Sequence, residues 1–145
     1  RVEIVSGTRK VIAVEVHDPM MVGEDGFDLG IMQHLDRHKV SYILKSTNAN
    51  SITFVLWDTD KSKRLIEELR TNYYRVITLP SSIVSVLGTN IALPGFLYRA
   101  SKALYEEGIN IESLGQSLNQ VNMQFVVKRD CYEKAVVALN TEFIK

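Results

Sequence analysis

PGFLYRASKALYEEGINIESLGQSLNQVNMQF, residues 94–125, is the stretch that decides the fold. Apolar residues at helical spacing follow its Pro-Gly turn: Phe96, Ala100, Ala103 and Leu104. Gly108 ends the predicted helix, because glycine takes the left-handed cap conformation without a steric penalty. An extended run over residues 109–114, a polar turn and an alternating strand over residues 121–125 come next. The order turn, helix, strand, turn, strand is half of a split βαβ unit.

The same half-unit occurs earlier in the chain, in the same register. A shift of 69 residues matches Gly26 with Gly95, Phe27 with Phe96, Leu35 with Leu104 and Asn50 with Asn119. A shift of 70 residues matches the last helices, pairing Asp60 with Asp130, Ile66 with Val136 and Leu69 with Leu139. It is rare for two unrelated segments to match by chance at a glycine, at both helix faces and at a turn asparagine. The chain is therefore predicted to contain an internal repeat.

The first copy has the pattern of a complete unit. Its predicted elements are a strand at residues 10–17, a loop at 18–28, a helix at 27–38, an extended segment at 40–47, a turn at 48–50, a strand at 52–56, a helix with Asp60 as N-cap, and a strand at 74–79. The order β-α-β-β-α-β predicts a ferredoxin-like sandwich of the α+β class.

The second copy lacks its last strand. Its final helix, with Ala135, Val136, Leu139 and Phe143 on one side, reaches almost to Lys145. A four-stranded sheet there needs a strand from elsewhere, and residues 1–5, before a predicted turn at 6–8, are the only spare candidate. With residues 80–82 as a linker, we expect one domain at 9–80. The other, formed by 1–8 and 81–145, would be completed by the N-terminal strand.

Composition excludes several classes of protein. Seventeen basic residues balance seventeen acidic ones, so no net field favours nucleic acid as a partner. No apolar run approaches the roughly 20 residues of a membrane span, so no membrane partner is expected either. A single cysteine, Cys131, excludes an internal disulfide and is compatible with a reducing cytoplasm. The chain starts at Arg1 without an initiator methionine, and we expect it to be part of a longer protein.

No catalytic motif is present in the sequence. There is no Walker loop, zinc-spaced Cys/His set or nucleophile elbow, so no catalytic, metal or cofactor site is predicted in this chain. His34 and His38 have the i,i+4 spacing of a metal pair, but no Cys or carboxylate completes a set, and we interpret them as part of a solvated helix face. Cys131 has no evident catalytic partner and is interpreted as inert.

The two turns that open the repeated helices are the candidate functional feature. Gly26 and Gly95 each lie at a strand-to-helix junction, where free N–H groups and the positive helix end suit the carboxylate of a small amino acid. The segments 41–43 and 110–112 could offer backbone carbonyls to its ammonium group. The alternative is that both glycines only allow the chain to turn tightly.

The same stretches resemble a known family. The Pro-Gly-Phe turn at 94–96, GINIESL at 108–114, VNMQFVV at 121–127 and the closing helix KAVVALNTEF at 134–143 resemble an ACT domain. Two such copies, the first opened by HDPMMVGEDGF at 17–27, are similar to the C-terminal regulatory region of aspartate kinase. The resemblance covers nearly the whole chain.

The resemblance implies an effector site between the turn of one domain and the second strand of its partner. By position, its candidate residues are Met21, Glu24, Gly26, Phe27 and Asp28 on the turn and Tyr42, Ile43 and Asn48 on the following strand. Their equivalents in the second copy are Pro94, Gly95, Phe96, Asn110, Ile111 and Glu112. The family often has aspartate at the position of Ile43, and threonine-sensitive members have glutamine near Thr47. Either Glu24 or Asp28 then holds the ligand's ammonium group, or the site is weak or silent.

The resemblance also implies a function. It predicts a cytoplasmic regulatory fragment that binds lysine or threonine, pairs into a homodimer through its ACT domains and acts on a kinase domain in cis. ATP and Mg would bind that kinase domain, which phosphorylates aspartate, and no cofactor is expected in this fragment. The alternatives are an ACT pair from another enzyme of amino-acid metabolism, a stand-alone sensor, and an RNA-binding sheet. Zero net charge and the absence of an RNP-like aromatic run argue against the last.

Overall fold

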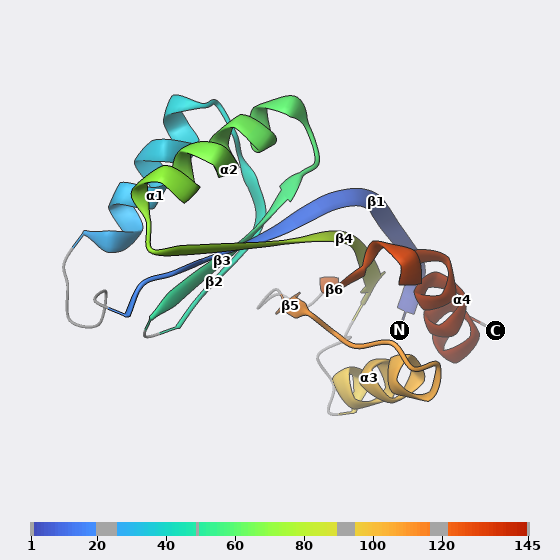
Figure 1. Cartoon of the computed structure of the whole chain (residues 1–145). Coiled ribbons are helices and arrows are strands. Elements are labelled where there is room, and N and C mark those ends of the chain that lie inside the picture. The colour runs from blue at the N-terminus through green and yellow to red at the C-terminus, as the bar shows by residue number, and fades with distance from the viewer. Residues whose placement is uncertain (1, 20–25, 49, 90–94, 117–121, 145) are drawn as a thin grey trace. The chain divides into compact units, whose positions relative to one another are not determined.

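The computed structural model describes residues 2–19, 26–48, 50–89, 95–116 and 122–144. In chain order these form β1 (Val2–His17), α1 (Phe27–Arg37), β2 (Tyr42–Thr47), β3 (Ser51–Trp57), α2 (Asp60–Asn72), β4 (Arg75–Gly88), α3 (Phe96–Glu106), β5 (Ser113–Gln116), β6 (Asn122–Lys128), the short 3₁₀ helix η2 (Arg129–Cys131) and α4 (Tyr132–Phe143) (Figure 1). Contacts divide the chain into two compact units. We call Val11–Pro80 the insert unit, and Arg1–Lys10 with Ser81–Lys145 the split unit.

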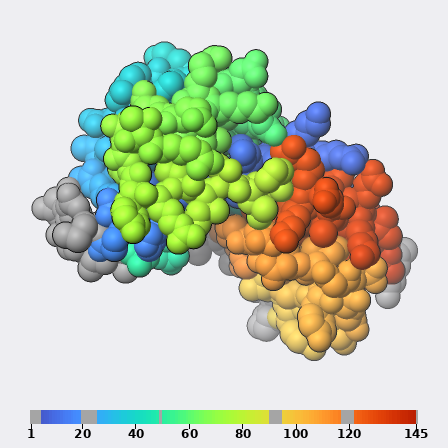
Figure 2. All heavy atoms as spheres, viewed as in Figure 1, coloured from blue at the N-terminus to red at the C-terminus, as the bar shows by residue number. Residues whose placement is uncertain are grey.

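The insert unit is a sheet with two helices packed on one face. Its strands lie in the order β2-β3-β1-β4, and β3 pairs antiparallel with both β1 and β2. Alternate residues of β3 point toward the helices, so Ile52, Phe54 and Leu56 form a core with Leu35 of α1 and Leu65 of α2. Side chains fill the space between the two helix ribbons, and α1 and α2 form one packed layer (Figure 2).

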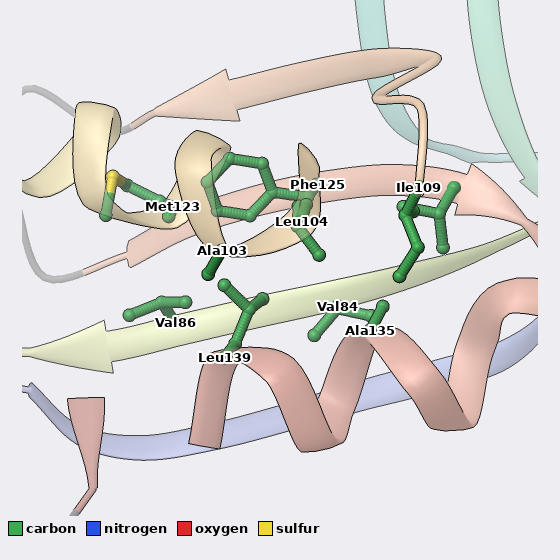
Figure 3. Close-up of a cluster of buried hydrophobic side chains, with 11 residues drawn as sticks. Val84, Val86, Ala103, Leu104, Ile109, Met123, Phe125, Ala135 and Leu139 are labelled. Carbon is green, nitrogen blue, oxygen red and sulfur yellow. The ribbon is translucent and has the colours of Figure 1, made fainter. Parts of the chain in front are cut away.

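The split unit repeats this arrangement. Its strands lie in the order β1-β4-β6-β5, with β6 antiparallel to both of its neighbours. Ser82 of β4 donates a hydrogen bond from Oγ to the carbonyl of Arg9 in β1, at 2.6 Å. Figure 3 shows the core between this sheet and its helices, where Phe125 of β6 packs with Leu104 of α3 and Leu139 of α4. The predicted fold, two ferredoxin-like βαββαβ sandwiches, is confirmed.

Two predicted breaks in the strands are wrong. Residues 6–8 were expected to turn, but β1 runs through them without interruption. A Cβ on Gly7 would lie 2.6 Å from Cε1 of Tyr132 and 2.8 Å from the carbonyl oxygen of Ile83, so the glycine allows a close approach rather than a turn. Residues 80–82 were expected to be a linker, and they lie inside β4.

Three element boundaries also differ from the predictions. The N-cap of α2 is Thr59 rather than Asp60, because Oγ1 of Thr59 accepts a hydrogen bond from the backbone N–H of Ser62 at 3.2 Å. Of the extended segment predicted at 109–114, only its last two residues lie in a strand, since β5 covers Ser113–Gln116. The strand predicted at 40–47 is β2, which begins at Tyr42.

Candidate functional site

The turn that opens α1 requires glycine for its backbone conformation. Gly26 is the N-cap of α1 with φ 83° and ψ 3°, in the left-handed region, and its carbonyl accepts a hydrogen bond from the N–H of Gly30 at 2.9 Å. Among the residues that the structure describes, no atom lies within 4 Å of the position that a Cβ would take. A glycine also has no side chain with which to cap the helix. Met21 and Glu24, predicted here, lie outside the described residues.

The turn that opens α3 has the same geometry. Gly95 is its N-cap with φ 101° and ψ −17°, and the N–H of Arg99 donates to its carbonyl at 2.8 Å. Within the described part of the chain, a Cβ at Gly95 would also have no atom within 4 Å. The predicted site residue Pro94 lies outside the described part of the chain.

The first residue of α1 and the first residue of α3 each pack against an aromatic ring at the end of the second helix of their unit. The ring of Phe27 meets the ring of Tyr73 edge-on, with centroids 5.6 Å apart. Phe96 stacks on Phe143 at 5.8 Å, and the Arg99 guanidinium lies over both rings, 5.6 Å and 4.8 Å from their centroids. The predicted site residues Phe27 and Phe96 therefore anchor the turns, and their rings are engaged by neighbours in the same unit.

Asp28, in the first turn of α1, is held by a lysine that the sequence did not single out. Nζ of Lys45 in β2 lies 2.7 Å from both carboxylate oxygens of Asp28. Lys45 pairs in register with Phe54 of β3, so its side chain lies on the helix-covered face of the sheet. A lysine among the alternating positions of a half-buried strand is the signal that could have identified it.

The predicted strand residues lie at three different places. Tyr42 begins β2, three residues before Lys45 and so about 10 Å away along the strand, with its ring 5.9 Å from that of Phe54. Ile43 lies where the pairing of β2 with β3 shifts register. The N–H of Asn48 donates to the carbonyl of Ser51 at 2.8 Å and closes the turn after β2.

The corresponding residues of the split unit precede β5. Nδ2 of Asn110 donates to Oε2 of Glu112 at 2.8 Å, and the N–H of Glu112 donates to the carbonyl of Val126 at 2.8 Å. Ile111 packs against the hydrophobic core. The structure therefore places these three residues in an ordered segment beside β6, outside regular strand.

His34 of α1 and His38, the C-cap of this helix, were predicted to lie on a solvated helix face without a carboxylate partner. This prediction is wrong, because both side chains contact the carboxylate of Glu68. Nδ1 of His34 donates a hydrogen bond to Oε2 of Glu68 in α2, and Nε2 of His38 lies 3.1 Å from Oε1 of the same residue. The guanidinium of Arg37 donates to Oε2 at 3.2 Å. The hydrogen bond from His34 and the contacts with His38 and Arg37 hold the pKa of the Glu68 carboxyl below its usual range. Burial raises the pKa of the neighbouring Tyr73 hydroxyl above its usual range.

The Glu68→Gln variant should show how this carboxylate contributes to stability. Because the folded-state pKa of Glu68 is depressed, its contribution is present above the unfolded value, about 4.3, and is lost as pH falls through the folded value. Urea unfolding followed between pH 3 and pH 7 should therefore show wild type more stable than the variant at pH 7 and the difference shrinking in acid. A difference at pH 3 as large as the difference at pH 7 would contradict the assignment.

Known relatives share this architecture. Residues 84–143 match the family model of the ACT domain. Over 99% of its length the chain is similar to aspartate kinase Ask_Ect of Stutzerimonas stutzeri strain A1501, with 36% identity, and it covers 31% of that protein. Solved structures of other proteins share its fold. The regulatory subunit of aspartate kinase from Thermus flavus has TM-score 0.84 at 17% identity over 98% of both chains. Escherichia coli aspartokinase III in complex with lysine and aspartate has TM-score 0.81 at 21% identity, over 99% of this chain and 33% of that one.

These findings place the segment 84–143 in the ACT domain family. The whole chain resembles the tandem ACT-domain regulatory region of aspartate kinases, as the sequence predicted. It spans about a third of the length of the aspartate kinase Ask_Ect. No helix formed by the described residues is long and apolar enough to cross a bilayer.

Proposed function

We propose that this chain is the regulatory portion of an aspartate kinase, and that its insert unit senses an end-product amino acid, lysine or threonine. The observation that carries the proposal is the start of α1, where a left-handed glycine has no capping side chain and no atom of the described residues lies near the position that a Cβ would take. The chain around this turn is similar over nearly its whole length to an aspartate kinase.

The carboxylate of an amino acid can bind to the free backbone N–H groups of such a turn. The first N–H groups of a helix have no partner within the helix, and the positive end of the helix dipole stabilises an anion there. Lysine is bound in the similar structure of Escherichia coli aspartokinase III. A ligand that bridges the start of α1 and strand β2 would change the packing of the insert unit, which is how we expect the signal to begin.

The insert unit is the better candidate of the two. In the split unit Arg99 stacks on Phe96 and Phe143 and also donates from Nε to Oε2 of Glu142 at 2.9 Å, which ties the start of α3 to the end of α4. The equivalent position in the insert unit is Gly30, which has no side chain to make such a tie. The start of α1 therefore lacks the arginine tie that the start of α3 has, and its own ion pair joins Asp28 to Lys45 of β2 instead.

The activity that this sensor would control is the phosphorylation of aspartate by ATP. We expect ATP and Mg to bind in a kinase domain in cis, and the protein to work in the cytoplasm. Feedback on this step by an end product would match supply to demand. An ACT pair from another enzyme of amino-acid metabolism, or one with a silent effector site, is the second candidate and gives a different result in the next experiment.

The Gly26→Val variant should abolish binding of the amino acid. Valine is strained at φ 83°, so the backbone at the start of α1 must move and its N–H groups lose their alignment. Isothermal calorimetry with lysine and threonine should give heat for at most one of them in wild type and for neither in the variant. Gly95→Val is the matched control, because it places the same strain at the other turn and should leave the heat unchanged. Unchanged binding in Gly26→Val would misplace the site, and no binding in wild type would favour a silent one.

We further propose that two copies of the chain pair through their sheets. Strands β2 and β5 each have only one neighbour in the described sheet, so each presents an edge that natural proteins cover or pair. Light scattering at tens of micromolar should then give the mass of a dimer, about twice the 16.4 kDa of one chain. A mass of one chain at that concentration would contradict the pairing.

A further inference from the structure

We propose that Lys45 determines the effector specificity of the turn at Gly26: its ammonium group occupies the Asp28 carboxylate and so excludes amino acids with a basic side chain. This inference rests on the proposed sensing function and narrows its ligand. It assigns the site to an amino acid with a neutral side chain, and it makes Lys45 the residue that rejects lysine.

The ion pair has the geometry of a fixed contact. Nζ of Lys45 lies 2.7 Å from each oxygen of Asp28, the short distance of a charge-assisted hydrogen bond. The side chain of Lys45 is only 19% exposed, although that of Asp28 is 51% exposed. The lysine stem thus lies against the sheet while its charged end reaches the first turn of α1. A lysine so placed is less free to leave its partner than one on an open surface.

The charges of Asp28 and Lys45 then determine which amino-acid side chains can bind beside the turn at Gly26. Asp28 is the acidic residue in the first turn of α1, and it is the described carboxylate that could receive the side-chain ammonium of a lysine ligand. Lys45 already supplies an ammonium to that carboxylate from within the chain. An incoming lysine would have to displace Lys45 or place a second cation beside it, and like charges at short distance repel. A ligand with a neutral side chain meets neither obstacle.

The second copy shows that the fold does not require the pair. The shift of 69 residues that relates the copies takes Asp28 to Leu97 and Lys45 to Leu114. Both leucines lie in the same elements as their counterparts, at the start of α3 and in β5, and both are partly exposed. In the β5–β6 pairing, Gln116 rather than Leu114 lies opposite Met123, the counterpart of Phe54, and it too carries no charge. The βαββαβ unit therefore forms without an ion pair of this kind. The charged pair is specific to the insert unit, where the proposed effector site lies.

The test compares lysine and threonine binding by calorimetry in wild type and in Lys45→Met, which keeps the length of the stem and removes the charge. The expected result is that wild type does not bind lysine measurably, while Lys45→Met releases Asp28 and gains lysine affinity of about tenfold or more. The double variant Lys45→Met/Asp28→Asn should lose that gain, because the freed carboxylate is gone. Lys45→Arg keeps a cation on Asp28 and should still reject lysine. Thermal unfolding of each variant checks that the insert unit remains folded.

Each outcome bears on one of the two statements. If wild type and Lys45→Met bind lysine equally well, or if Lys45→Met gains no lysine binding while it still binds threonine, the specificity role of Lys45 is overturned and the sensing function stands. If a gain in lysine affinity survives in the double variant, Asp28 is not the receiving group and the inference also falls. If no variant binds either amino acid, both the sensing function and the role of Lys45 are overturned.

Discussion

Replacing Phe125 by alanine should destabilise the split unit by about 3–5 kcal/mol, the usual cost of deleting a fully buried aromatic ring. Phe125 is completely buried, and its ring lies in the core formed by β4, β6, α3 and α4 (Figure 3). The volume it leaves is bounded by Leu104 and Leu139, which belong to helices that cannot collapse fully onto the sheet. Hydrogen exchange of the β6 amides should become faster as the split unit loses stability, because these amides are protected by the folded core.

The control for this variant is Leu114→Ala. Leu114 pairs with Phe125 across β5 and β6 but is 43% exposed, so its loss should cost less than about 1 kcal/mol. The single tryptophan, Trp57, lies in β3 of the insert unit and reports separately on that unit by fluorescence. Equal effects of Phe125→Ala and Leu114→Ala on β6 exchange would contradict the described core.

Replacing Gly7 by valine should detach the first part of β1 from the split unit. Any Cβ at this position would lie 2.8 Å from the carbonyl oxygen of Ile83, and backbone atoms cannot move aside as a flexible side chain can. Overpacking of this kind costs about 1–3 kcal/mol. We expect β4 amides near Ile83 to exchange faster, and the packing of Val5 against the split-unit core to be lost.

Ser6→Val is the matched control for Gly7→Val. Ser6 is the preceding residue of the same strand and is exposed, so its side chain points to the opposite side of the strand. Valine suits a strand, and this change should alter stability by no more than about 0.5 kcal/mol. Removal of residues 1–6 should reproduce the effect of Gly7→Val. A stable Gly7→Val variant with unchanged exchange in β4 would show that the first residues of β1 do not support the split unit.

The repeated βαββαβ pattern was predictable because it depends on local signals. Apolar spacing predicted each helix face, and the two left-handed glycines at Gly26 and Gly95 kept the copies in register. The break at residues 6–8 was predicted for an equally local reason, since Ser-Gly-Thr is a turn-like sequence. The structure uses Gly7 differently, because Tyr132 lies against it, and a contact across more than 120 residues leaves no local trace in the sequence.

The candidate site was predictable only in part, because local sequence signals do not show contacts between residues that are distant in the sequence. The turn at Gly26 follows from its glycine and from the helix after it. The partner of Asp28 is 17 residues away, and the carboxylate that meets His34 is 34 residues away, so neither pairing follows from helix or strand periodicity. Both pairs join a helix to a neighbouring element, and they become visible only when the unit is folded.

The chain passes between its two units inside strands rather than through loops. The boundaries at Lys10/Val11 and Pro80/Ser81 fall within β1 and β4, which are neighbours in the sheet. A protease needs several residues of unpaired chain to fit its active site, and such chain is found at loop tips rather than in paired strands. Excision of residues 11–80 would cut both strands in mid-length and leave each piece with unpaired backbone groups. We therefore expect limited proteolysis to spare both crossings, so that the two units persist, and are degraded, as a single piece.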